Sequence, residues 1–526
     1  MVSLLTLAVA AHTALRAAAN SNSKTGQAEI LPWAPPPADS PDLIAHLRDT
    51  SRPKLAYSTY IAWYEDGGMN ESALLHEAEF MANRLRQHGW TLVLHDYGWQ
   101  VCGTTYNITP ISTPTKLGCY HLDQYGRLLP APQRYPSTAK DGSWKPIADK
   151  MHAVGMGFGL HLIHGVPIIA AQKKLPVLGT NFTLDQLVAQ KCPSFIADHW
   201  IINASHPAAQ AYYDSMVSMW ADAGIDFIYF DGVEGSDCGC QAGAVSLLSS
   251  AMKRLGKGMF MYTSFGPPSA ASGCSFEELS ELAAYVRVGG DTQDFWDDDM
   301  QLGFSGFTRT VAPLLKPHHF GDLAGMMIGK VHCRLGTPGC GTGPDYFIPS
   351  NRSALTKDEV ISDVALNAIF RSTWWHAGAF SYSNDWDLSM MTNDDVIRIT
   401  MMSTNTRQVP TSITTPASWD GPGVVWTGDD TVEDWKYVLM VNMCPCTSTA
   451  LKCWPCPADP ATEVSVDVDF LALGLTPSTS CEVTELWGSK SMGRVYGKLH
   501  ASLRSHASLL VKLSNCTGPT SDIIAV

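Results

Sequence analysis

The chain has 526 residues, of which 45% are hydrophobic and 16% are charged, a composition that excludes wholesale disorder. Its length allows a large core and more than one domain. Acidic residues outnumber basic ones by 50 to 36, which gives a net charge of -14 and argues against a phosphate-binding surface. Because of this acidic balance, we expect no nucleic-acid partner. The sequence has no stretch of 18 or more apolar residues, so we expect no membrane span.

The N-terminus has features of a processed leader. A short apolar run from Leu4 to Ala11 precedes the small residues Ala17 to Ala19, and we interpret residues 1–22 as a signal peptide. Six Asn-x-Ser/Thr sequons support a glycosylated protein of the secretory pathway, located outside the cell or in a lysosome-like or vacuole-like compartment. The sequon asparagines are Asn70, Asn107, Asn181, Asn203, Asn351 and Asn515.

A Pro-rich arm, residues 23–53, precedes a long alternation of apolar runs and amphipathic segments that spans residues 54–404. Eight of the apolar runs are predicted strands: Leu55–Trp63, Thr91–Tyr97, Phe158–His164, Phe227–Asp231, Met259–Ser264, Tyr285–Gly289, Leu323–Ile328 and Thr373–Phe380. Eight strands separated by helical stretches predict an α/β fold, a (β/α)8 TIM barrel. The alternative, an open doubly wound sheet, usually has a Gly-rich phosphate loop after its first strand, and this chain has none.

Three of the predicted helices have clear boundaries: Glu71–Gln87, Pro207–Ala223 and Thr356–Arg371. Ser205 is the expected N-cap of the second helix, and Gly224 its stop. Thr356 and Glu359 form a predicted capping box.

After residue 404 the helical pattern ends. Short strand-like runs separated by Pro, Gly, Ser and Thr turns predict that residues 405–526 form a C-terminal antiparallel β-sandwich. The expected strands there are Tyr437–Val441, Val464–Asp469, Cys481–Leu486 and Ser508–Leu513.

The 14 cysteines favour disulfides in an oxidising compartment. Cys333 and Cys340 close a short Gly/Pro loop and form one candidate pair, and Cys102 and Cys119 flank another loop. A CxC…CxxC cluster over residues 444–456 has spacing that zinc could use, but the compartment argues against zinc, and we expect no metal.

Charged and aromatic residues gather at the predicted carboxyl ends of the barrel strands, where barrel enzymes place their active sites. Strand 2 ends in Asp96, Tyr97 and Trp99, strand 4 ends in Asp231, and strand 6 leads through Arg287 to Asp291. Pyranose rings stack on aromatic rings, and glycoside cleavage requires two carboxyl groups. The rim therefore predicts a sugar site.

His161 and His164 on strand 3 are three residues apart, which places them on opposite faces of the strand. The pair is a weak metal site, and we expect one core histidine and one rim histidine.

At this point the chain resembles glycoside hydrolase family 27, the melibiase or α-galactosidase family, as a divergent branch. The resemblance rests on the order and spacing of several motifs: DYGW (96–99), ADKMHAVGMGFGLHL (148–162), WADAGIDFIYFDG (220–232), RVGGDTQDFW (287–296), TNDDVIRI (392–399) and SHASLLVKLS (505–514). It implies a secreted retaining exo-glycosidase that removes terminal α-galactosyl residues and needs no cofactor.

The resemblance also implies residue roles. Asp231 matches the nucleophile and Asp291 the acid/base, while Arg287 and Asp96 match residues that contact the terminal sugar. Tyr60 stands where the family usually has a Trp that walls the sugar site.

The chain departs from the family pattern at several positions, two of which are candidate sugar contacts. Tyr97 replaces the second of two adjacent Asp residues, and Tyr229 replaces a Lys two residues before the nucleophile. Galactose specificity is therefore open, and the alternatives are β-L-arabinopyranoside, α-N-acetylgalactosaminide, or a sugar-binding pseudoenzyme. A carbohydrate is the expected partner, Trp99 is a further candidate contact to it, and a homodimer is left open.

Overall fold

The computed structural model describes the chain in segments. They are residues 31–60, 69–102, 120–193, 198–233, 239–264, 274–288, 296, 320–323, 325–329, 331–334, 347–350, 353–409, 423–443 and 463–518. For residues 190–193, 332–334, 347–350 and 423, only the backbone is described.

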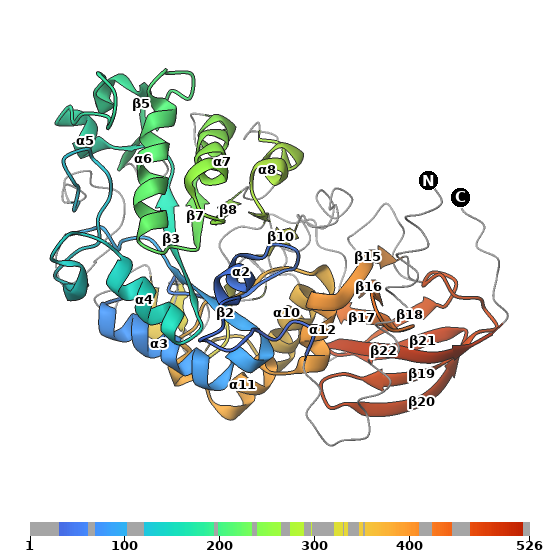
Figure 1. The fold of residues 1–526 in the computed structure, drawn as a ribbon. Helices are drawn as coiled ribbons and strands as arrows, with labels where there is room; N and C mark the ends of the chain where they lie inside the picture. Colours follow the sequence, from blue (N-terminus) through green and yellow to red (C-terminus); the bar gives the residue numbers. More distant parts are fainter. Residues whose placement is uncertain are drawn as a thin grey trace, which may run out of the picture. The chain divides into compact units, whose positions relative to one another are not determined.

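A parallel sheet forms the centre of the first domain (Figure 1). Its strands are β1 (Leu55–Ser58), β2 (Trp90–His95), β3 (Gly157–Ile163), β7 (Phe227–Asp231), β8 (Phe260–Ser264), β9 (Tyr285–Arg287), β10 (Phe320–Asp322), β11 (Gly325–Met326) and β14 (Trp374–His376). Their order across the sheet is β10-β9-β8-β7-β3-β2-β1-β14-β11, and each strand runs parallel to its neighbours.

The two ends of this sheet, β10 and β11, are consecutive pieces of one chain segment. Gly325 follows Asp322 by three residues, and the pieces pair with different neighbours: β10 with β9, and β11 with β14. The sheet therefore closes on itself, and the predicted TIM barrel is confirmed. The observed seventh strand is split: β10 ends just before the predicted strand Leu323–Ile328, and only β11 lies within it.

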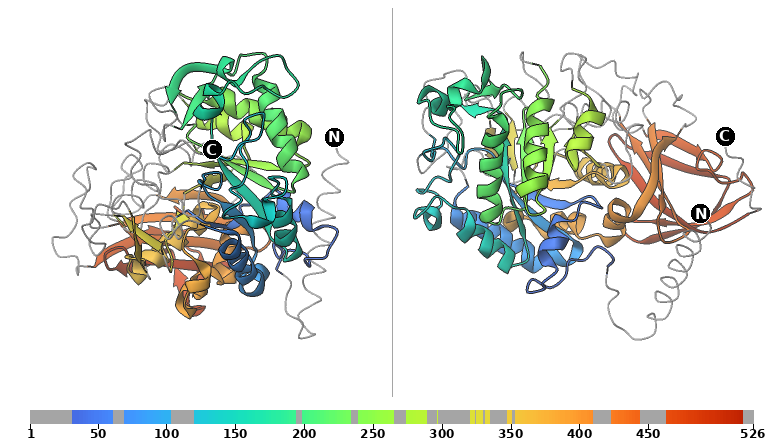
Figure 2. Two further views of the ribbon diagram at one scale, coloured as in Figure 1. Left: turned by 90° about the vertical axis from the view of Figure 1, so that its left-hand side faces the viewer. Right: turned by 45° about the horizontal axis from the view of Figure 1, so that its top comes forward.

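Helices follow the strands on the outside of the sheet: α3 (Glu71–Arg84), α4 (Lys145–Ala153), α6 (Ala209–Asp222), α7 (Ala242–Leu255), α8 (Phe276–Leu282), α10 (Lys357–Phe370), α11 (Asp385–Met391) and α12 (Asp394–Met402). The green helices α6 and α7 lie side by side in each view (Figures 1 and 2). The capping box of Thr356 and Glu359 is present on α10. The predicted N-cap of α6 is wrong, because the helix begins after Ala208 and not near Ser205.

Part of the Pro-rich arm is helical. Helix α2 (Leu43–Arg48) buries Leu43 and Leu47, and Arg48 Nε lies 2.9 Å from Oδ1 of the fully buried Asp226 just before β7. The sequence analysis predicted no helix in this arm, because its proline content hides the short amphipathic run Leu43–Arg48.

Residues between β3 and β7 form an insertion that the sequence pattern did not predict. It contains a three-stranded antiparallel sheet of β4 (Val166–Pro167), β6 (His199–Ile202) and β5 (Val188–Pro193), with helix α5 (Ile168–Gln172). A separate hairpin pairs β12 (Val331–Arg334) with β13 (Phe347–Ser350).

The C-terminal domain is an antiparallel β-sandwich, as predicted. Its strands are β15 (Ser403–Val409), β16 (Gly423–Asp430), β17 (Lys436–Asn442), β18 (Val464–Asp469), β19 (Ser480–Glu485), β20 (Lys490–Tyr496), β21 (Lys498–Leu503) and β22 (Ser508–Thr517). Six of them form the sheet β15-β16-β17-β22-β19-β20, and β18 pairs with β21. Both sheets contribute buried side chains to one apolar core, with Val466 of β18 and Val438 of β17 among them.

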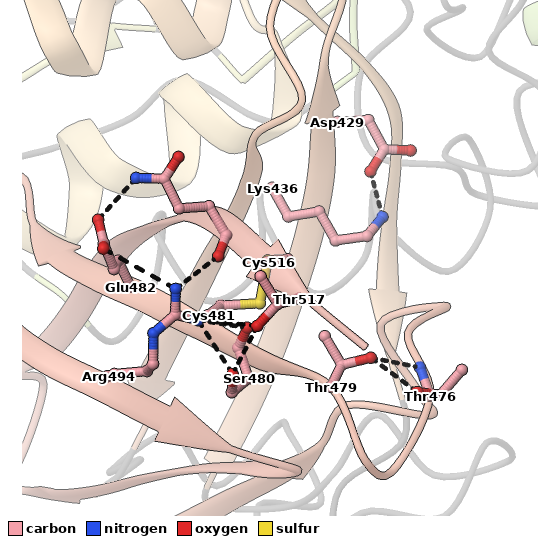
Figure 3. Close-up of a disulfide and its surroundings, with 11 residues drawn as sticks. Asp429, Lys436, Thr476, Thr479, Ser480, Cys481, Glu482, Arg494, Cys516 and Thr517 are labelled. Atoms are coloured by element: carbon pink, nitrogen blue, oxygen red, sulfur yellow. Dashed lines mark hydrogen bonds and ion pairs between the residues drawn. A yellow bond between two sulfur atoms is a disulfide. The ribbon is translucent and has the colours of Figure 1, made fainter. Parts of the chain in front are cut away.

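Two disulfides are described completely. Cys481–Cys516 ties β19 to β22 beside the hydrogen-bonded Arg494 (Figure 3). Cys240–Cys274 joins the segment after β7 to the start of α8. Cys102 is disulfide-bonded, whereas its expected partner Cys119 lies outside the described residues.

The other cysteines with a predicted role also lie outside the described part of the structure. Cys340 and residues 444–456 are not described, and the side chain of Cys333 is not described either. The pairing of Cys333 with Cys340 therefore stays a prediction.

Candidate active site

A row of aromatic rings crosses five neighbouring barrel strands at one level. The parallel register pairs Phe320 with Tyr285, Tyr285 with Tyr262, Tyr262 with Tyr229, and Tyr229 with His161. Each of these pairs is stacked, with ring centroids 4.4–6.0 Å apart and interplanar angles of 12–23°. We call these five residues the aromatic row. The aromatic row forms part of one layer of the barrel interior and ends at His161.

A polar layer lies one step further along the strands. Because residues two apart on a strand share a face, Asp231, Ser264, Arg287 and Asp322 follow Tyr229, Tyr262, Tyr285 and Phe320 on the inner side of the sheet. This layer lies at the carboxyl ends of the strands, where barrel enzymes carry their chemistry. The aromatic row is thus the floor beneath the candidate site.

Asp231 is the centre of the polar layer. His161 Nε2 lies 3.1 Å from its Oδ2 atom, and Arg287 Nη2 lies 3.5 Å from its Oδ1 atom. Burial by itself would raise the pKa of Asp231, but the charge of Arg287 and the hydrogen bonds from His161 and Ser264 lower this pKa well below its usual range. Asp231 is therefore a carboxylate held ionised in a buried site.

Two histidines of β3 and its end contact Asp231 differently. The His161 side chain reaches the carboxylate, whereas His164 Nδ1 lies 3.3 Å from the backbone oxygen of Asp231. Burial lowers the pKa of His164 to about 4, so its ring is neutral at neutral pH. Burial also disfavours charge on His161, but Asp96 and Asp231 together raise its pKa above the usual value. The sequence-based expectation of one core and one rim histidine missed that both meet the same aspartate.

Asp96 and Tyr97 follow β2 at the same end of the barrel. The backbone N–H of Asp96 donates to Thr59 Oγ1 at 3.0 Å, and its carboxylate accepts the N–H of Tyr97 at 2.7 Å. The Tyr97 hydroxyl donates to Asp198, a buried carboxylate that also accepts from Tyr120. Tyr97 is thereby turned toward the insertion between β3 and β7.

The remaining candidate residues are placed as follows. Tyr229 belongs to the aromatic row and is 6% exposed. Trp99 is fully buried, and its indole N–H donates to the backbone oxygen of His161 at 2.9 Å. It therefore supports β3 from the core, and we do not propose it as a sugar contact. Tyr60 follows β1 and packs against Met327 and Ala377. Asp291 lies outside the described residues.

The sequence-based candidates lacked two residues of this site, Ser264 and Asp198, and did not connect His161 with Asp231. Ser264 ends β8 as Asp231 ends β7, so the rule that strand ends carry chemistry could have found it. Asp198 lies in an insertion with no predicted strands, and no local pattern marks it. Within the described segments, no cluster of three or more His, Cys, Asp or Glu residues suits a metal ion.

None of the helices in the described part of the chain has both the length and the apolar character needed to cross a bilayer.

The closed parallel barrel with an ionised aspartate at the end of its fourth strand, followed by a β-sandwich, is an architecture that glycoside hydrolases use. The C-terminal region matches the family described as the alpha galactosidase C-terminal beta sandwich domain, over residues 420–513. The chain is similar to glycoside hydrolase family 27 proteins, through this β-sandwich model and through a solved structure of that family. A comparison with curated protein sequences found no match.

Several solved structures have a fold similar to that of this chain. A family 27 β-L-arabinopyranosidase from Geobacillus stearothermophilus, in complex with arabinose, is 26% identical with a TM-score of 0.75, covering 88% of this chain and 97% of its own. α-Galactosidase I from Mortierella vinacea is 15% identical, with a TM-score of 0.59 and coverage of 88% and 97%. An α-galactosidase from Saccharomyces cerevisiae is 12% identical, with a TM-score of 0.58 and coverage of 88% and 98%.

Proposed function

We propose that the protein is a retaining exo-glycosidase that removes terminal galacto-configured pyranosyl residues by double displacement. The observation that carries this proposal is the ionised Asp231, held by Arg287 and His161 at the end of β7. A carboxylate that stays charged and is aimed by two cationic or donor groups suits attack on an anomeric carbon. A sugar-binding protein without catalysis has no need of such a group.

In this mechanism Asp231 attacks the anomeric carbon while Asp291 protonates the leaving oxygen. The resulting ester is then hydrolysed by a water molecule that Asp291 deprotonates. Asp291 follows Arg287 by four residues, which span at most ~14 Å of extended chain. Retention requires the two carboxyl groups to come within about 5–5.5 Å of each other in the working enzyme.

The site also bears on which terminal sugar the enzyme removes. α-D-Galactopyranose and β-L-arabinopyranose share the configuration of their ring hydroxyls, and the arabinose lacks the C6 hydroxymethyl group. Tyr97 fills the position of a carboxylate that would bind an outer hydroxyl, and its own hydroxyl is committed to Asp198. This favours β-L-arabinopyranosides over α-galactosides, as does the 26% identity to an enzyme described as a β-L-arabinopyranosidase.

A substrate panel tests the proposal. The p-nitrophenyl glycosides of β-L-arabinopyranose, α-galactose, α-N-acetylgalactosamine and α-glucose are assayed at acidic and neutral pH, and the anomer released first is identified by proton NMR. We expect hydrolysis of the first two, with retention, and a higher kcat/KM for the arabinopyranoside. Binding of these sugars with no hydrolysis of any would favour the pseudoenzyme.

The nucleophile has its own test. Asp231→Gly removes the attacking carboxylate, so turnover of the best substrate should fall to background. Azide can enter the vacated space and attack in its place, which should produce a glycosyl azide of inverted anomeric configuration. Residual activity at the wild-type level in Asp231→Gly would end the assignment.

We also propose that the protein passes through the secretory pathway. Support comes from the two disulfides and from the sequon residues Asn70, Asn181, Asn203 and Asn515, which are all exposed. Asn107 and Asn351 lie outside the described residues. A eukaryotic host should secrete the protein into the culture medium, and its mass should fall on treatment with an N-glycosidase. An unglycosylated product that stays inside the cell would contradict the proposal.

A further inference from the structure

His161 stands where the aromatic row meets the nucleophile. Its ring stacks on Tyr229 with centroids 5.6 Å apart and planes 12° from parallel, and the ring of Tyr97 meets it edge-on at 5.9 Å. The residue is 5% exposed. Contacts on a face and an edge leave the imidazole little freedom to rotate, so its Nε2 atom stays directed at Asp231 Oδ2, 3.1 Å away.

Charged groups from several barrel strands face this ring. Asp96 from the end of β2 and Asp231 from β7 are negative, while Arg287 from β9 is positive. His95 on β2 also interacts with His161, but burial lowers the pKa of His95 to about 3, so it is neutral. Two carboxylates therefore oppose one guanidinium, and the local field favours a proton on His161.

The second ring nitrogen has a different environment. Within the described residues, His161 Nδ1 is buried and has no hydrogen-bond partner. A proton on Nδ1 costs free energy there, and the two carboxylates offset this cost. The pKa of His161 is raised above its usual value, in contrast to the lowered pKa values of His95 and His164.

We propose that His161 is a positioning residue for the reaction: as an imidazolium fixed by the aromatic row, it keeps the Asp231 carboxylate ionised and oriented for attack. The inference rests on the proposed function for its catalytic consequence. It assigns a cationic role to a residue of β3, so that Asp231 is held from two sides, by His161 at Oδ2 and by Arg287 at Oδ1.

The role also changes during the catalytic cycle. When Asp231 becomes an ester, its negative charge disappears, and His161 then faces only Asp96 and Arg287, one negative and one positive group. The imidazolium is held less strongly in the covalent intermediate than in the free enzyme. The ion pair between His161 and Asp231 is therefore present before the ester forms and is restored when the ester is hydrolysed.

Three variants separate charge, hydrogen bonding and packing. His161→Phe keeps a ring that can stack on Tyr229 but removes the donor and the charge. His161→Gln keeps a neutral donor, and His161→Lys keeps a cation. His500→Gln is the matched control, because His500 Nδ1 lies 2.7 Å from Asp467 in the β-sandwich, in a histidine–carboxylate pair far along the chain from the barrel.

The kinetic measurement is kcat/KM against pH with the 2,4-dinitrophenyl glycoside of the best sugar in the panel. This leaving group needs no proton from Asp291, so a fall in kcat/KM at alkaline pH reports another group. We expect the wild type to lose activity as pH rises through the His161 pKa, above about 6.5. His161→Gln should lose that fall, and His161→Phe should lose about 10- to 100-fold in kcat/KM.

His161→Lys should recover part of the activity lost in His161→Phe and keep it to higher pH, and His500→Gln should behave as wild type. If His161→Phe retained wild-type kcat/KM and the wild-type pH profile, the positioning role would be wrong and the ring would serve packing alone.

A second measurement does not need turnover. In protein labelled with ¹³C-histidine, the resonance missing from His161→Gln identifies His161, and its pKa is followed in wild type and in Asp231→Asn. We expect the His161 pKa to fall in Asp231→Asn, and an unchanged value overturns the inference. A wild type that cleaves no glycoside but shows this fall would refute the proposed function while leaving the Asp231–His161 ion pair established.

Discussion

The Tyr97 phenol donates its hydrogen bond to Asp198, a carboxylate that lies 101 residues further along the chain, in the insertion between β3 and β7. Asp198 accepts a second phenol hydrogen bond from Tyr120 and lies 2.8 Å from His199 Nδ1. Burial alone would raise the pKa of Asp198, but His199 and the two phenols lower it. The ring of Tyr97 is thus anchored from outside the barrel, and its position does not depend on bound sugar.

This anchoring predicts the substrate preference of a Tyr97 variant. Tyr97→Ala removes the ring, so a hydroxymethyl group should be accommodated better. A pocket's discrimination over a group of this size is about 10- to 200-fold. The ratio of kcat/KM for β-L-arabinopyranoside to that for α-galactoside should fall by about tenfold or more. Tyr120→Phe is the control, since it removes one donor to Asp198 but leaves the Tyr97 ring, and an unchanged ratio in Tyr97→Ala would contradict the prediction.

Removing the charge of Arg287 should move the acid limb of the pH profile. Asp231 must be ionised to attack, and Arg287 helps to hold its pKa low. In Arg287→Met the pKa of Asp231 rises, so kcat/KM should start to fall at a higher pH on the acid side, with a loss of about 10²- to 10³-fold at the optimum. Arg398→Met removes an Arg–Asp pair with Asp430 at 2.7 Å and should leave the acid limb unchanged.

A buried carboxyl group in α10 makes stability depend on pH. Asp363 Oδ1 accepts a hydrogen bond from Asn367 at 2.8 Å, whereas Oδ2 has no partner within the described part of the chain. Burial raises the pKa of Asp363 to about 8. A group whose pKa is raised by folding contributes its full stability below its unfolded pKa, about 3.9, and loses it as pH rises through the folded value.

Asp363→Asn removes this titration. Its unfolding free energy relative to wild type should increase between pH 5 and pH 8, by on the order of 1–3 kcal/mol, the usual cost of a buried polar group without a partner. Thermal melts of both proteins across that range measure the difference. A wild type and a variant with parallel pH dependences would show that Asp363 does not titrate there.

The two described disulfides offer a matched pair. Cys240–Cys274 spans 34 residues and Cys481–Cys516 spans 35, so each should stabilise the folded chain by about 2–4 kcal/mol through loop closure. Only the first lies beside the candidate site, where Cys274 Sγ contacts the backbone oxygen of Val233, two residues after Asp231.

Replacing both cysteines of either pair by serine should therefore lower Tm in each case, while only Cys240→Ser/Cys274→Ser changes kcat/KM. Calorimetry and the assay of the best glycoside check the two readouts. An equal loss of kcat/KM from the Cys481→Ser/Cys516→Ser variant would show that the loss reflects stability alone.

The sequence determined the architecture and the position of Asp231 at a strand end, because both depend on local patterns. Eight apolar runs of strand length, separated by helical stretches, define a barrel, and Phe227–Phe230 marks Asp231 as the end of a buried strand. The capping box of Thr356 and Glu359 was likewise readable within four residues.

The tertiary structure decided what depends on register and on distant segments. The pairing of Tyr229 with His161 brings a β3 histidine to Asp231, and no periodicity within β3 contains that information. Asp198 reaches Tyr97 from an unpredicted insertion, and the split seventh strand closes the barrel through two different neighbours. A sequence pattern reports which face of an element is buried, but only the assembled sheet fixes which charged groups share that space and therefore which of them hold a proton.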